Sequence, residues 1–86
     1  MPIIRLSSNN IIAEISSKGV ELQYLSKTRG ENIMWSVDDA HWNRCAPILF
    51  PIVGKLKTDK YNWNGTSCNM KQHGFARDME FQLIEQ

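Results

Sequence analysis

The 86-residue chain lacks the features that mark nucleic-acid-binding, membrane and secreted proteins. Its ten Lys and Arg residues are balanced by nine Asp and Glu, and no basic run is longer than two residues. Because nucleic-acid binding depends on clustered cations that neutralise phosphates, we expect no nucleic-acid partner. The longest apolar stretch, Ile48 to Val53, is interrupted by Pro51 and is far shorter than the roughly 20 residues that cross a bilayer. The N-terminus shows no secretory signal, so we expect a cytoplasmic protein without membrane contact.

Cysteine is also scarce. Cys45 and Cys68 belong to no C-x-x-C pair, and in a reducing compartment we expect two free and mostly buried thiols. A zinc site needs four well-placed nitrogen or sulfur ligands. Only His41 and His73 accompany the cysteines, and their spacing fits no zinc-finger pattern. We therefore expect neither a metal nor another cofactor.

Length limits the core that this chain can build. Eighty-six residues make one small domain or part of one. A chain of this size hides only roughly 60–65% of the surface that its unfolded form exposes. The hydrophobic content of 42% and charged content of 22% are nevertheless those of a globular protein. With no internal repeat or linker to divide it, we expect residues 1–86 to form a single unit that folds with help from association.

Most of the apolar pattern has the two-residue period of a β-strand. The first third predicts a β-meander, because its alternating runs are separated by turn-forming Ser, Asn, Lys and Gly residues. Asn64-Gly65 predicts a tight hairpin, since both residues readily take positive φ angles. Strands are expected over residues 3–6, 11–16, 20–24, 32–35, 61–63, 67–70 and 79–84. Helix evidence is confined to residues 37–44, where Asp38 or Asp39 is a candidate N-cap. The prediction is an all-β fold of antiparallel strands and hairpins with at most one short helix.

The apolar run over residues 48–53 is followed by a glycine and two lysines. Pro51 favours an edge strand or a bulge, because proline cannot donate to a strand ladder. Gly54 indicates a sharp change of direction or the close approach of another group. Lys55 and Lys57 then lie at a strand end, where a solvated charged surface is the alternative to a binding role.

A second candidate site surrounds His73-Gly74-Phe75-Ala76-Arg77-Asp78. A loop histidine can donate a hydrogen bond to a sugar or carbonyl oxygen, or act as a general acid near neutral pH. Arg77 can bind a hydroxyl group or an anion, or it can pair with Asp78 or Glu80. A purely structural role is the alternative for both His73 and Arg77.

The sequence resembles the aldose 1-epimerase (mutarotase) superfamily, and within it the bacterial branch found with lactose and galactose utilisation genes. The pieces LFPIVG and HGFARD, in this order and spacing, are together specific. The resemblance covers nearly the whole chain and is carried by Lys18–Leu22, Ile33–Trp35, Trp42–Gly54, a Tyr61 to Gly65 hairpin and Gln72–Asp78. It implies that residues 1–86 are the N-terminal portion of a galactose-mutarotase-like β-sandwich, also called a supersandwich.

The resemblance also implies a reaction, the interconversion of the α and β anomers of a hexose such as galactose or glucose. His73 matches the family histidine that contacts the sugar near its ring oxygen and assists catalysis. Lys55 stands where the family commonly has arginine, and Arg77 matches the arginine of HGFAR; with His73 they are the expected substrate-binding residues. In the hexose-6-phosphate branch, basic residues of this region help to hold a phosphate.

The general base of the family is a late glutamate, and its usual general acid is a second histidine; both positions lie beyond Gln86. The expectation is therefore a hexose mutarotase that is incomplete for catalysis as an isolated chain. The alternatives are a non-catalytic module that binds a hexose or hexose phosphate, and a self-associating β module. We expect a homo-oligomer or association with a missing second half.

Overall fold

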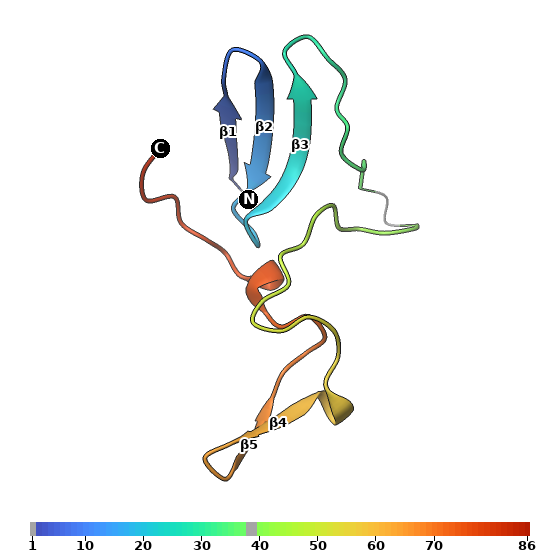
Figure 1. Ribbon diagram of the computed structural model, residues 1–86, viewed down its shortest axis with the longest axis vertical. Helices are drawn as coiled ribbons and strands as arrows, with labels where there is room; N and C mark the ends of the chain where they lie inside the picture. Colours follow the sequence, from blue (N-terminus) through green and yellow to red (C-terminus); the bar gives the residue numbers. More distant parts are fainter. Residues whose placement is uncertain (1, 38–39) are drawn as a thin grey trace.

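The computed structural model describes residues 2–37 and 40–86 (Figure 1). The described chain is built from two antiparallel sheets and two short 3-10 turns. In chain order the elements are β1 (Ile3–Ser7), β2 (Ile11–Ser16), β3 (Glu21–Lys27), η1 (Lys57–Asp59), β4 (Lys60–Trp63), β5 (Thr66–Asn69) and η2 (Ala76–Asp78). The all-β prediction is confirmed.

One face of the meander of β1, β2 and β3 is largely apolar, and the other mixes polar side chains with Ile3 and Ile12. Its cross-strand pairs include Ile4 with Ile15 and Leu6 with Ala13, and residues opposite each other project from the same side of a sheet. The same register places charged and hydroxyl groups, such as the pair of Arg5 and Glu14, on the other side. The side chains of the apolar face are Ile4, Leu6, Ile11, Ala13, Ile15, Leu22 and Leu25.

The chain end covers part of this apolar face. The amide of Phe81 donates to the carbonyl of Ser17 at 2.8 Å. A cavity of about 150 Å³ lies between Phe81 and Leu83 of this segment and Ile4 and Ile15 of the sheet. The opposite end of the face stays open, and residues 79–84 form an isolated bridge at Glu80 in place of the expected strand.

One other expected strand, over residues 32–35, is wrong, and the described part of residues 37–44 shows none of the helical turns considered there. Residues 32–35 return beside β3. The side-chain oxygen of Asn32 accepts the amide of Leu25 at 3.1 Å, so a side chain takes the place that a backbone carbonyl would have in a strand ladder. Residues 48–53 bend around Pro51 and pair only at Phe50. Residues 40–44 form turns and bends, and the candidate caps Asp38 and Asp39 lie outside the described residues.

A backbone contact between Phe50 and Gly74, the Phe50–Gly74 junction, holds the second half of the chain together. The carbonyl of Phe50 accepts the amides of Phe75 at 3.0 Å and Ala76 at 3.1 Å. A Cβ atom on Gly74 would lie 2.3 Å from the Phe50 oxygen, so only glycine fits. The junction therefore fixes η2 against the apolar run that precedes Gly54.

A second close approach joins η2 to the meander. Gly19, in the turn between β2 and β3, has φ +71°, and a Cβ there would lie 2.5 Å from the carbonyl oxygen of Arg77. The Gly19 amide donates to the carbonyl of Met79 at 2.6 Å. As a result, η2 lies between the three-stranded sheet and the β4–β5 hairpin (Figure 1).

The described chain is extended and has a small core. Its radius of gyration is 16.3 Å, whereas a compact domain of this length has about 12 Å. Among the described residues, the hydrophobic ones that are buried are Cys45 and Ala76. Leu6 and Ile11 of the apolar face are 43% and 50% exposed. The meander therefore offers an apolar surface on which further polypeptide can pack.

The Phe50–Gly74 junction can be tested with two matched alanine substitutions. Gly74 and Gly65 have nearly equal φ angles, +75° and +74°, but only Gly74 faces a backbone atom, since nothing lies within 4 Å of a Cβ on Gly65. Gly65→Ala should cost about 1 kcal/mol from the left-handed conformation. Gly74→Ala should cost about 1–3 kcal/mol more because the junction must open. Urea unfolding measures both, and equal losses would contradict the assigned role of the junction.

Candidate functional site

His73 and Gly54 are joined by two hydrogen bonds. The amide of His73 donates to the Gly54 carbonyl at 2.7 Å, and the amide of Gly54 donates to the ring Nδ1 of His73 at 2.8 Å. Both residues have positive φ, +62° for His73 and +96° for Gly54. The pair brings the LFPIVG and HGFARD segments to one place and holds the half-buried imidazole at the surface.

Lys55 lies beside this pair because it follows Gly54 in the chain. Its side chain is 58% exposed and forms an ion pair with Asp59, four residues later. An exposed pair of this kind contributes little to stability, roughly 0–1 kcal/mol. The Asp59 carboxylate thus holds the Lys55 ammonium, which can be redirected toward a ligand at small cost.

Arg77 lies on η2, four residues after His73. Its Nη2 donates to the carbonyl of Gln72 at 3.1 Å, while its Nε is buried and has no acceptor among the described residues. In the described structure Arg77 forms no ion pair with Asp78 or Glu80, which was the alternative expected from the sequence. Asp78 accepts from Arg44 at 2.8 Å, and Glu80 accepts from the hydroxyl of Ser17.

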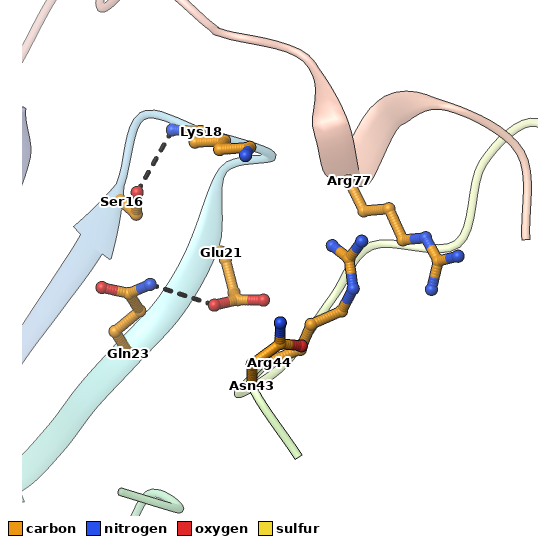
Figure 2. Close-up of a pocket in the computed structure, with 7 residues that line it drawn as sticks. All are labelled: Ser16, Lys18, Glu21, Gln23, Asn43, Arg44 and Arg77. Carbon is orange, nitrogen blue, oxygen red and sulfur yellow. Dashed lines mark hydrogen bonds between the residues drawn. The ribbon is translucent and has the colours of Figure 1, made fainter. Parts of the chain in front are cut away.

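Arg77 helps to line a pocket of about 190 Å³ between η2 and the start of β3, here called the polar pocket (Figure 2). The carboxylate of Glu21 faces this pocket from a residue that is only 8% exposed, and it accepts a hydrogen bond from Gln23 at 3.0 Å. The lining residues are Ser16, Lys18, Glu21, Gln23, Asn43, Arg44 and Arg77. The pocket therefore combines three cations with one buried carboxylate.

The three residues expected to bind substrate thus fall into two groups. His73 is bonded to Gly54, and Lys55 follows Gly54 in the chain. Arg77 lines the polar pocket while donating to the carbonyl of Gln72, the residue before His73. Sequence reasoning missed Glu21 and Arg44 as site residues. Both residues belong to segments that carry the family resemblance, and this was the one feature of the sequence that could have marked them as lining the pocket.

Two pKa values are shifted near the polar pocket, that of Asp78 by a hydrogen bond and that of Cys45 by burial. The hydrogen bond from Arg44 lowers the pKa of Asp78, and the charges of Arg77 and Lys18 act in the same direction. Burial raises the pKa of the Cys45 thiol, with help from the nearby Glu21 carboxylate. Cys45 donates to the carbonyl of Trp35 at 3.3 Å, so it acts as a structural thiol.

Other classes of site were searched for in the described part of the chain. Cys45 and Cys68 are both free thiols. Residues 2–37 and 40–86 contain no group of three or more His, Cys, Asp or Glu that could hold a metal ion. Within the same ranges, no helix is long and apolar enough to cross a membrane.

Known proteins share both the sequence and the fold of this chain. The family model described as aldose 1-epimerase matches residues 2–86. "Protein LacX, plasmid", from Lactococcus lactis subsp. lactis, is 31% identical over 87 residues, an alignment that covers 95% of this chain. A galactose mutarotase related enzyme from Lactobacillus acidophilus matches the structure with a TM-score of 0.93 and 37% identity. A galactose mutarotase-like protein from Lactobacillus casei ATCC 334 gives 0.90 and 37%.

These relatives are much longer than the chain. The alignments to both solved structures cover 99% of this chain but 29% of each matched chain. The chain likewise spans 29% of the length of the Lactococcus lactis protein. What is shared is therefore the fold of one portion of each relative.

The ion pair of Asp78 and Arg44 predicts an acid-sensitive contribution to stability. Because the folded-state pKa of Asp78 lies below the ordinary value of 3.8, the contribution is present above that pH and is lost as pH falls through the folded-state pKa. Asp78→Asn should lower the free energy of unfolding by about 0.5–1 kcal/mol at pH 7, since the pair is partly exposed. The difference from the unchanged chain should shrink toward pH 3. Urea unfolding at both pH values measures this, with Glu31→Gln as an exposed control, and a difference independent of pH would contradict the assignment.

Proposed function

The chain belongs to the aldose 1-epimerase family, and from this premise we propose that it supplies sugar-contacting residues of a hexose mutarotase. The observation that carries the proposal is the His73–Gly54 pair, which holds a hydrogen-bonding imidazole against the residue that precedes Lys55. Both residues of the pair come from segments that carry the family resemblance. The proposed substrate is a hexose such as galactose or glucose, and the proposed setting is carbohydrate metabolism in the cytoplasm.

Mutarotation needs two positioned proton-transfer groups. A base removes the proton of the anomeric hydroxyl while an acid protonates the ring oxygen, which breaks the bond between the anomeric carbon and that oxygen. The open aldehyde turns, and ring closure reverses the two transfers. In this scheme His73 assists near the ring oxygen, and Lys55 donates to a sugar hydroxyl.

Arg77 has a separate proposed role. It lines the polar pocket beside Lys18 and Arg44, and its guanidinium also donates to the carbonyl of Gln72, the residue before His73. Guanidinium and ammonium groups suit a hydroxyl-rich or phosphorylated ligand. We propose that Arg77 contacts a more distant part of the same ligand, such as the phosphate of a hexose phosphate.

Binding without turnover is the second candidate function for the isolated chain. The chain spans 29% of its relatives, and none of its carboxylates occupies the position of the family base. Accordingly, we expect the 86-residue chain to bind a hexose weakly and not to accelerate mutarotation.

Sugar binding can be tested by titrating galactose and glucose while observing amide resonances or Trp fluorescence. Replacing His73 with alanine removes one hydrogen bond, so the affinity should fall about two- to tenfold. Lys60→Ala, at an exposed lysine of β4, is the matched surface control and should leave the affinity unchanged. Polarimetry with freshly dissolved α-galactose should show only the spontaneous rate. Equal affinity in the His73 variant, or binding by neither sugar in the unchanged chain, would contradict the proposal.

The open part of the apolar face supports a proposal about partners. We infer that it is covered by polypeptide that supplies the remainder of the family fold. Leu6 and Ile11 are too exposed for a finished sheet face, and the matched structures extend well beyond the aligned portion. Burying one such side chain contributes about 1.5–3 kcal/mol.

Two substitutions on β1 test this surface. Leu6→Glu places a charge on the apolar face, whereas Ser7→Glu places it on the opposite face of the same strand. Mixing the chain with a polypeptide that carries the remaining portion of the Lactobacillus acidophilus relative should give a one-to-one complex in sedimentation. Leu6→Glu should weaken the complex at least about tenfold, with little effect of Ser7→Glu. A chain that forms only homodimers, or stays monomeric in the mixture, would overturn this assignment.

A further inference from the structure

We propose that the backbone amide of Gly54 sets the tautomer of His73 and makes it a hydrogen-bond donor toward the ligand. The inference deepens the proposed function, on which its statement about the ligand rests. Gly54 is a positioning residue in this proposal, because it acts on the ligand only through the imidazole.

The direction of one hydrogen bond fixes the tautomer. The Gly54 amide lies 2.8 Å from Nδ1 of His73, and an amide N–H can only donate. Nδ1 must therefore carry a lone pair. A neutral imidazole has one ring proton, so that proton is on Nε2.

The ring is also fixed in orientation. The amide of His73 returns a hydrogen bond to the Gly54 carbonyl at 2.7 Å, so the same two residues are joined in both directions. One residue further on, Gly74 sits against the Phe50 carbonyl, where no side chain fits. These contacts hold His73 before any ligand arrives, which reduces the entropy lost on binding.

Nε2 is the ring atom left for a ligand. No group of the described chain forms a hydrogen bond with Nε2. Nε2 is also not one of the buried polar atoms without a partner, which among the described residues are Ser26 Oγ and Arg77 Nε, so a ligand can reach it. The ammonium group of Lys55, the residue after Gly54, can likewise only donate. The Gly54 loop thus presents two donors, which suit the acceptor lone pairs of sugar hydroxyl and ring oxygens. A ligand that offers only donors, such as an alkylammonium ion, should not bind there.

The tautomer can be measured directly in the 86-residue chain, without any ligand. In a ¹⁵N-labelled sample at about pH 8, where an ordinary histidine is neutral, Nδ1 of His73 should resonate as an unprotonated ring nitrogen. It should show a scalar coupling to the Gly54 amide nitrogen across the hydrogen bond. A protonated Nδ1, or no coupling in a sample whose His73 ring resonances are assigned, would overturn the proposal.

Two substitutions separate the roles of the two ring nitrogens. His73→Asn keeps an acceptor near the Nδ1 position and tolerates the positive φ angle, but it lacks the distal donor. His73→Gln lacks an acceptor at that position and keeps a distal donor. Hydrogen exchange of the Gly54 amide should stay slow in His73→Asn and become at least about tenfold faster in His73→Gln. Equal exchange in the two variants would contradict the proposal.

Sugar binding then distinguishes this proposal from the proposed function. If the coupling and the exchange pattern are found but galactose and glucose do not bind, the tautomer assignment stands and the proposed function fails. If the sugars bind and the coupling is absent, the Gly54 assignment fails alone. Where both hold, His73→Asn should bind galactose about two- to tenfold more weakly than the unchanged chain, because Nε2–H is lost.

Discussion

One backbone carbonyl, that of Phe50, organises the second half of this protein. It accepts the amides of both Phe75 and Ala76, and it can do so only because Gly74 has no side chain to separate the two segments. Four residues after Phe50 the same approach brings Gly54 within hydrogen-bonding distance of His73. The position of the imidazole therefore depends on main-chain contacts.

Two chemically different sites result from this arrangement. The Gly54 loop offers neutral and cationic donors at the surface, where a ligand can reach them. The polar pocket places Arg77 and Arg44 around the buried carboxylate of Glu21, and this mixture can bind a ligand or stabilise the packing of η2 against β3. Gly19 makes that packing possible, because a larger residue would collide with the Arg77 carbonyl.

The sequence predicts the meander and the β4–β5 hairpin because their alternation and turn residues are local signals. It fails at residues 32–35, where the side chain of Asn32 takes a ladder position, and it does not identify the partner of residues 48–53, which is a glycine far along the chain. Two motifs predict His73 and Lys55 as substrate-binding residues, and the structure bonds His73 to Gly54, the residue before Lys55. No spacing rule reveals that Arg77 faces a different pocket, because that outcome depends on the close approach at Gly19. The bond that sets the His73 ring is invisible to sequence for the same reason, since its donor is a backbone amide.

The most direct test of this account is hydrogen exchange at the amides of Phe75 and Ala76, both of which donate to the Phe50 carbonyl. The amides of Val53 and Lys55 are the reference, because the described structure gives them no acceptor. The account predicts that Phe75 and Ala76 exchange at least about tenfold more slowly than the reference amides after correction for intrinsic rates. Exchange of all four amides at their intrinsic rates would contradict it, because the Phe50–Gly74 junction would then not hold His73 in place.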